Sequence, residues 1–353
     1  MSPAPASENS DEFAETMTWA FHQPMMTTKI RRMVGSEYLV FFLSAVYFLV
    51  LTPFTPGFCS LENLENILSS LLPLFVVSVG QTFVLITGGI DLSVVSTIGL
   101  ASISGAFVMS HAGWGLAGSI WATSAGVVVM VLVGVLLGVA NGSAVAWLRM
   151  PAFIVTLTTM MFVSGLAIWL TQSRKIGGLP PGFVSIGKNI GLALPLTCLL
   201  GWLAHFILER CLMGRWIFAV GQNPKTALIS GVPVRGVLVM TYVISGFCAA
   251  CASIIYTGRL ETGDPVLVQR ILLDVVGATV IGGTSLYGGK GKILWTLSGV
   301  LFLTLIDNSL NLAGFSHFVI MMVKGLVILL AAVFDSIKSR WTQNETPPVE
   351  EPV

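Results

Sequence analysis

Two glycine breaks inside strongly apolar sequence constrain this chain more than any other feature. They are LITGGIDLS at residues 85–93 and VIGGTSLYGG at residues 280–289. Because glycine loses more backbone freedom on folding than any other residue, a Gly-Gly pair stops a helix. In lipid, irregular backbone survives only where protein or a water-filled cavity surrounds it. Matching breaks in two halves of a chain predict an internal repeat around a translocation pathway. Tight turns between spans are the alternative.

Composition places the chain in a membrane. Of its 353 residues, 54% are hydrophobic and 10% are charged, against about 25% charged residues in soluble domains. The formal net charge of +1 gives no electrostatic reason for a nucleic-acid partner. Five cysteines are too few for a disulfide scaffold, and Cys248 and Cys251 are interpreted as small packing residues rather than a redox or metal pair.

Apolar runs predict an all-α polytopic membrane protein with about ten transmembrane helices, since a helix needs roughly 20 residues to cross the hydrocarbon core. The two runs beside the glycine breaks are short, and broken or half-spanning helices there would lower the number of full spans to about eight. The predicted spans are 38–55, 67–87, 93–110, 117–147, 152–171, 190–208, 236–256, 272–286, 293–311 and 316–336.

Charge predicts that both termini are cytoplasmic. Residues 1–37 are expected to be a cytoplasmic disordered tail with a basic segment next to the membrane, 38–336 a transmembrane permease domain, and 337–353 a cytoplasmic tail. With this orientation, twelve Lys and Arg residues lie inside and five lie outside, as the positive-inside rule requires. The inner ones are Lys29, Arg31, Arg32, Arg149, Arg210, Arg215, Lys225, Arg235, Lys290, Lys292, Lys338 and Arg340, and the outer ones are Arg174, Lys175, Lys188, Arg259 and Arg270.

The longest predicted cytoplasmic loop, residues 209–235, contains a short helix with clear ends. Asn223 suits the N-cap, Pro224 the first helical position, and Gly231 a left-handed C-terminal stop. Its apolar residues, Ala227 and Leu228 among them, would help it dock into a groove on another protein. An interfacial helix that packs on its own spans is the alternative.

Four stretches of the chain resemble a known family. They are GQTFVLITGGIDLS at 80–93, the segment from Asn141 to Gly165 that contains MPAFIVTLTTM at 150–160, GRWIFAVGQNPKTALISGV at 214–232, and VIGGTSLYGGKG at 280–291. In this order they resemble the permease subunits of bacterial monosaccharide importers driven by ATP, the ribose, xylose and galactose group. The likeness spans roughly residues 40–335.

The resemblance implies a fold similar to the vitamin B12 importer class, in the bacterial inner membrane. It also implies a cytoplasmic ATP-binding subunit, a periplasmic sugar-binding protein, and a second permease copy or paralogue as partners. A ribose-like pentose is the favoured cargo. The short helix would be the coupling helix, although Pro224, Lys225 and Thr226 stand where relatives have acidic or Ala-Ala residues. The expected ATPase-coupling residues are Asn223, Pro224, Lys225, Ala227, Leu228 and Gly231.

No enzymatic role is expected on this chain. The stretch 283–291 evokes a phosphate loop, but its spacing fails, and Gly291 stands where Ser or Thr would hold magnesium. ATP and magnesium are therefore assigned to the partner subunit, with no metal or cofactor here. The alternative is a carrier driven by an ion gradient, which needs an intramembrane ionisable group. The candidates for that group are Asp91, Asp274, Asp307 and Lys324.

The translocation pathway is expected to be lined by glycine and weakly polar side chains, which hydrate a passing sugar without trapping it. Asp91 has a second interpretation, as a cap for the backbone amide of Ser93 or Val94. Ser and Thr also commonly bridge membrane helices, which is the structural alternative for them. The pathway candidates are Gly88, Gly89, Asp91, Ser93, Asn141, Thr156, Thr159, Gly282, Gly283 and Ser285.

Overall fold

The structure is a computed structural model that describes residues 39–111, 116–267 and 271–343, with side chains described as far as residue 333. Its contacts divide the chain into residues 1–39 and 40–353, and the helices below belong to the second unit apart from the first residue of α3. The predicted tail at 1–37 and residues 344–353 of the predicted C-terminal tail lie outside the described residues.

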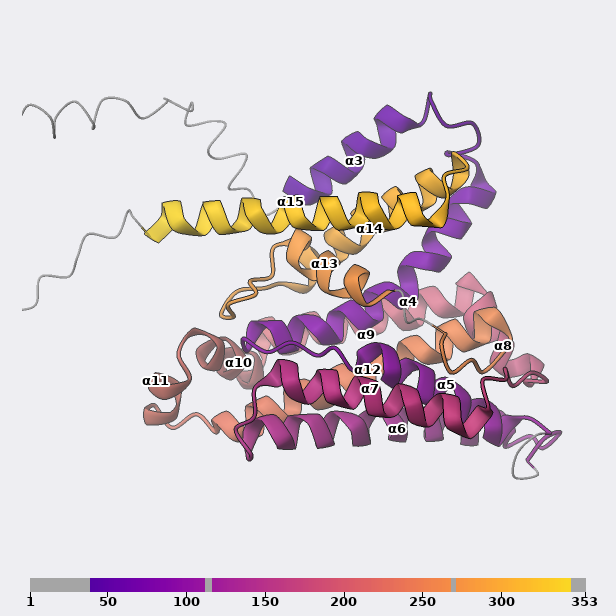
Figure 1. The fold of residues 1–353 in the computed structure, drawn as a ribbon, viewed down its shortest axis with the longest axis horizontal. Coiled ribbons are helices and arrows are strands. Elements are labelled where there is room, and N and C mark those ends of the chain that lie inside the picture. Colours follow the sequence, from indigo (N-terminus) through magenta and orange to yellow (C-terminus); the bar gives the residue numbers. More distant parts are fainter. Residues whose placement is uncertain (1–38, 112–115, 268–270, 344–353) are drawn as a thin grey trace, which may run out of the picture. The chain divides into compact units, whose positions relative to one another are not determined.

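All named elements within the described ranges are helices, and Figure 1 shows their arrangement. Each of the ten predicted spans overlaps a helix of its own, and the helices α8, α10 and α11 are additional. The helices are α3 (Leu39–Leu51), α4 (Leu61–Ile86), α5 (Val94–Met109), α6 (Ala122–Ala146), α7 (Ala152–Thr171), α8 (Pro181–Lys188), α9 (Ile190–Arg210), α10 (Leu212–Gln222), α11 (Pro224–Ile229), α12 (Val234–Leu260), α13 (Leu272–Gly282), α14 (Ile293–Leu312) and α15 (His317–Gln343).

Six of the described helices are long and apolar enough to cross a membrane, namely α4, α6, α7, α9, α12 and α14. The helices α3, α5, α13 and the part of α15 up to Val333 are apolar but shorter. The prediction of an all-α polytopic membrane protein is therefore confirmed for the described residues, in which six helices can cross a membrane. The number of about ten spans stays a prediction, because α3, α5 and α13, with 13, 16 and 11 residues, fall below the length of an unaided crossing.

Most of the apolar surface of three spanning helices is left uncovered by the rest of the chain. Within the most apolar 18-residue stretch of each helix, only 28% of the residues of α6 are buried, and only 22% of the residues of α7 and of α9. Phe162, Trp169 and Trp202 are among the exposed side chains. A water-soluble monomer rarely exposes so large an apolar surface, whereas lipid or a second membrane subunit would cover it favourably.

Small residues allow α12 to pack closely between α4 and α6 (Figure 1). A side chain on Gly134 or Gly138 of α6 would overlap the backbone of α12 at Gly246 or Tyr242. On the other side of α12, Cys248 lies against Gly80 of α4. Stripes of small residues are the usual means of close packing between membrane helices. Both Cys248 and Cys251 are buried free thiols, in agreement with the packing interpretation.

Candidate functional site

Both glycine breaks are connections between consecutive helices. The helix α4 ends at Ile86 and α5 begins at Val94, while α13 ends at Gly282 and α14 begins at Ile293. The backbone is left-handed at Gly88 (φ +77°) and Gly283 (φ +112°), which L side chains rarely adopt. This arrangement matches the interpretation of the breaks as turns.

The two breaks contact each other and the end of α10. The amide of Gly289 donates a hydrogen bond of 2.8 Å to the carbonyl oxygen of Ile86. A Cβ atom on Gly288 would lie 2.9 Å from the carbonyl oxygen of Gly221 and from the amide nitrogen of Gly88. We name this contact of Gly88, Gly221, Gly288 and Gly289 the glycine junction. It joins three backbone segments that are at least 67 residues apart in the sequence, and Gly221 lies just before the predicted coupling helix.

The predicted coupling helix is present as α11, and its predicted ends are confirmed. The side chain of Asn223 accepts hydrogen bonds from the amides of Lys225 (3.0 Å) and Thr226 (3.1 Å), so that it caps the helix. Pro224 is its first residue. Beyond the last turn Gly231 has φ +82°, the left-handed stop expected there.

The orientation of α11 differs from the expectation for Ala227. Its side chain is only 4% exposed and belongs to the protein's own apolar core, so it cannot enter a partner's groove in this conformation. The exposed apolar side chains of α11 are Leu228 (64% exposed) and Ile229 (88% exposed). Ala227 therefore seats the helix, while Leu228 and Ile229 present its apolar surface outward.

A groove of about 550 Å³ runs beside α11, between the end of α6 and the start of α12. Leu228 lies in its wall, and Arg149, Lys225 and Arg235 give it a basic border. An apolar ridge beside a basic groove is a surface that another protein can recognise through both apolar burial and charge complementarity.

Asp91, at the first glycine break, is the centre of a buried hydrogen-bond network. Its side chain is 2% exposed, and Oδ1 accepts from the amide (3.0 Å) and hydroxyl (2.6 Å) of Ser93. The predicted cap on the Ser93 amide is therefore confirmed. Oδ2 accepts from the hydroxyl of Ser245 in α12 at 2.8 Å. Ser245 was not expected, since a single serine in an apolar helix carries no local signal.

The network continues to α6 and α7. Asn141 donates from Nδ2 to Ser93 Oγ at 2.8 Å and accepts from the Thr159 hydroxyl at 2.7 Å. Thr156 donates to the carbonyl oxygen of Ile90 at 3.1 Å. Five of the ten pathway candidates thus come together around one helix break. In this conformation their polar atoms bind one another and tie α5, α6, α7 and α12 together.

The remaining candidates are the glycines of the two breaks and Ser285 of the second break. Gly89 faces the Tyr242 hydroxyl, which a Cβ atom on the glycine would approach to 2.7 Å. Gly282 packs against the backbone of Trp295, so its small size serves the contact of α13 with α14. Ser285 lies in a turn, where its amide donates to Lys290 and its hydroxyl accepts from Tyr287. The role of all ten residues in a pathway stays a prediction.

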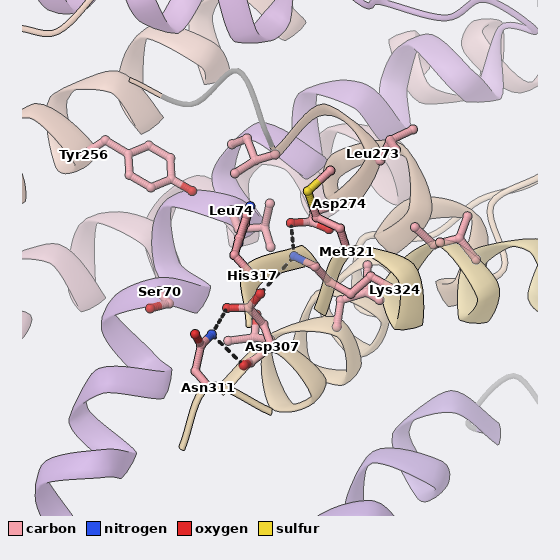
Figure 2. A pocket seen from close by; sticks show the side chains of 15 residues that line it. Ser70, Leu74, Tyr256, Leu273, Asp274, Asp307, Asn311, His317, Met321 and Lys324 are labelled. Atoms are coloured by element: carbon pink, nitrogen blue, oxygen red, sulfur yellow. Dashed lines mark hydrogen bonds and ion pairs between the residues drawn. The ribbon is translucent and has the colours of Figure 1, made fainter. Parts of the chain in front are cut away.

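A second polar cluster involves the ionisable candidates at the other end of α13. Lys324 of α15 lies 2.8 Å from Asp274 of α13 and 2.9 Å from Asp307 of α14. Dashed lines in Figure 2 mark both contacts. Three of the four ionisable candidates from the sequence thus meet in one cluster, in which Asp307 is partly exposed. Paired in this way, an ammonium group and carboxylates tolerate a partly buried position.

Uncovered apolar helices with polar clusters buried between them are the features of a polytopic membrane protein. The chain belongs to the family described as branched-chain amino acid transport system / permease component, whose model matches residues 63–332. This confirms the permease resemblance from the sequence motifs. No solved structure matches the chain.

Curated relatives cover most of the chain. The ribose import permease protein RbsC of Bacillus subtilis (strain 168) is 36% identical over 82% of this chain and 90% of its own length. The L-arabinose transport system permease protein AraH of Escherichia coli (strain K12) is 33% identical over 87% and 92%. The D-allose transport system permease protein AlsC of the same strain is 29% identical over 86% and 93%.

Proposed function

We propose that this chain is the membrane-spanning permease subunit of an ATP-driven, binding-protein-dependent importer of a monosaccharide in the bacterial inner membrane. The observation that carries the proposal is similarity over more than four fifths of the chain to permeases named for ribose, L-arabinose and D-allose. A ribose-like pentose is the favoured cargo, because a ribose permease is among the more similar relatives.

The partners follow from the role of a permease. A cytoplasmic ATP-binding subunit would dock on α11, a periplasmic binding protein would deliver the sugar, and a second permease would complete the channel. The exposed Leu228 and Ile229 and the adjacent basic groove support the first contact. The bias of twelve basic residues against five supports a cytoplasmic position for this loop and for both termini.

Uptake of sugar should depend on ATP hydrolysis by the partner. In vesicles that contain the complete importer, we expect vanadate to stop uptake, and we expect a protonophore to leave it unchanged while ATP is held constant. The measurement is the initial rate of labelled sugar accumulation. Uptake that persists with vanadate and stops with the protonophore would favour the second candidate, an ion-gradient carrier of a small polar solute. The observation that favours an ion-gradient carrier is the position of Lys324 between two carboxylates, because such a carrier needs an ionisable group within the membrane.

A substitution at the exposed Ile229 tests the coupling helix more directly than a substitution at the buried Ala227. Ile229→Asp should abolish co-purification of the ATP-binding subunit, because it puts a charge into an apolar contact. The permease itself should fold normally, since Ile229 is 88% exposed. Ile229→Val is the matched control, because it keeps the contact apolar. If Ile229→Asp assembles and transports like the wild type, α11 is an ordinary interfacial helix.

A further inference from the structure

A cavity of about 270 Å³ lies between α4, α12, α13, α14 and α15, around the Lys324 cluster (Figure 2). The cavity lies at the start of α13 and at the end of α14. The glycine junction lies in the connection between the end of α13 and the start of α14. The two features are therefore at opposite ends of these helices. With the orientation of the proposed function, the cavity belongs to the external half of the protein.

The polar lining of the cavity is a mixture of donors and acceptors. Asp307, which is partly exposed, pairs with Lys324 and also accepts from Asn311 Nδ2 at 3.2 Å. An ammonium group has three donors, and Asp274 and Asp307 engage two of those of Lys324. The carboxylate oxygens and the Asn311 carbonyl retain further acceptor positions. Leu74 and Tyr256 add apolar surface to the same wall.

Thr304 adds a hydroxyl group without a hydrogen-bond partner to the wall of the cavity. Its side chain is 5% exposed and lines the cavity, yet its Oγ1 atom is buried without a hydrogen-bond partner. A buried hydroxyl without a partner is unfavourable, and such groups are rare in native structures. Thr304 also lines a second cavity of about 350 Å³ that shares Ser70, Asp307 and Asn311 with the first. The two cavities thus meet along one polar wall.

We propose that this cavity is a docking subsite for the monosaccharide within a single permease, a proposal that rests on the proposed function. Adjacent hydroxyl groups of a sugar both donate and accept, as Asp307, Asn311 and Thr304 require. The volume lies just below the range of drug-sized pockets, which suits one small ligand. A metal ion suits the site less, because Lys324 already occupies the position between the carboxylates. A neutral ligand leaves that charge balance unchanged.

The test compares two threonines in the same chemical state. Thr197 of α9 is also buried with an unpartnered Oγ1 atom, but it lines neither cavity. Thr304→Val and Thr197→Val are each introduced into the complete importer in proteoliposomes. The initial rate of ATP-driven uptake is measured with D-ribose, L-arabinose and D-allose. Thr304→Val should lower uptake of the transported sugar about fivefold at subsaturating concentration, the equivalent of one neutral hydrogen bond. Thr197→Val should transport like the wild type.

A binding measurement separates this proposal from the proposed function. Saturation-transfer NMR is recorded with the same three sugars on the permease in nanodiscs, without the binding protein. We expect a signal in the wild type and in Thr197→Val, and its loss in Thr304→Val. Equal uptake or equal NMR signals in the wild type and Thr304→Val would overturn the subsite, and so would no NMR signal in the wild type. A wild type that accumulates none of the three sugars with ATP would contradict the proposed function, while the NMR comparison still decides the subsite.

Discussion

Replacing Gly221 by alanine is expected to abolish transport and to reduce sharply the amount of folded permease. A Cβ atom at this position would overlap the carbonyl oxygen of Ile86 and lie 2.6 Å from the amide nitrogen of Gly289. Both neighbours are backbone atoms that already bond each other, so neither can move without opening the glycine junction. Overpacking of this kind costs about 1–3 kcal/mol. The measurements are the yield of monodisperse protein in detergent and the uptake rate.

A matched glycine isolates the effect of the junction. Gly165 lies in α7, has no positive φ, and would place a Cβ atom in open space. Gly165→Ala should therefore leave folding and uptake unchanged, with a small gain in helix stability at most. Wild-type folding and uptake in Gly221→Ala would show that the three backbone segments do not need to stay in contact during transport.

The longer helices could be predicted from the sequence because most apolar runs are about as long as a membrane crossing. The run at 152–171 coincides with α7, and the long run at 117–147 contains α6. The helices α8 and α10 could not be predicted in this way, since they have 8 and 11 residues and are amphipathic rather than uniformly apolar. Length and hydropathy detect spans, and they do not detect short surface helices.

The parts of the site that depend on local chemistry were also predictable. The cap at Asn223 and the bond from Ser93 to Asp91 join residues within three positions of each other. The helix stop depends on Gly231 alone. The buried side of Ala227 was missed because a helix of six residues has too few positions to define a face.

Long-range partners could not be predicted. Nothing near Asp91 indicates that Ser245, 154 residues away, donates to its carboxylate. The pairing of Lys324 with Asp274 and the contact of Gly221 with Gly289 likewise depend on how the helices pack. A sequence shows which side chains are chemically able to bond, and the packing of the helices decides which of them meet.

Replacing Asp91 by leucine is expected to have the second large effect. The change removes the acceptor of three hydrogen bonds, those from the Ser93 amide, the Ser93 hydroxyl and the Ser245 hydroxyl. Each donor would then be buried without a partner, at a cost of about 1 kcal/mol or more per donor. We expect the apparent melting temperature of the detergent-solubilised permease to fall by several degrees, and uptake to be lost, because the first glycine break loses its hydrogen bond to α12.

Asn189→Ala is the control for the loss of a side-chain cap alone. Asn189 caps α9 by accepting from the Gly191 amide at 2.8 Å, but this bond is exposed to solvent. Water can replace an exposed acceptor, so the control should lower the melting temperature much less than Asp91→Leu. Ser245→Ala should lie between the two, since it removes a single donor from the network. If Asp91→Leu melts and transports like Asn189→Ala, the buried network contributes neither to the stability of the contact between the first glycine break and α12 nor to translocation.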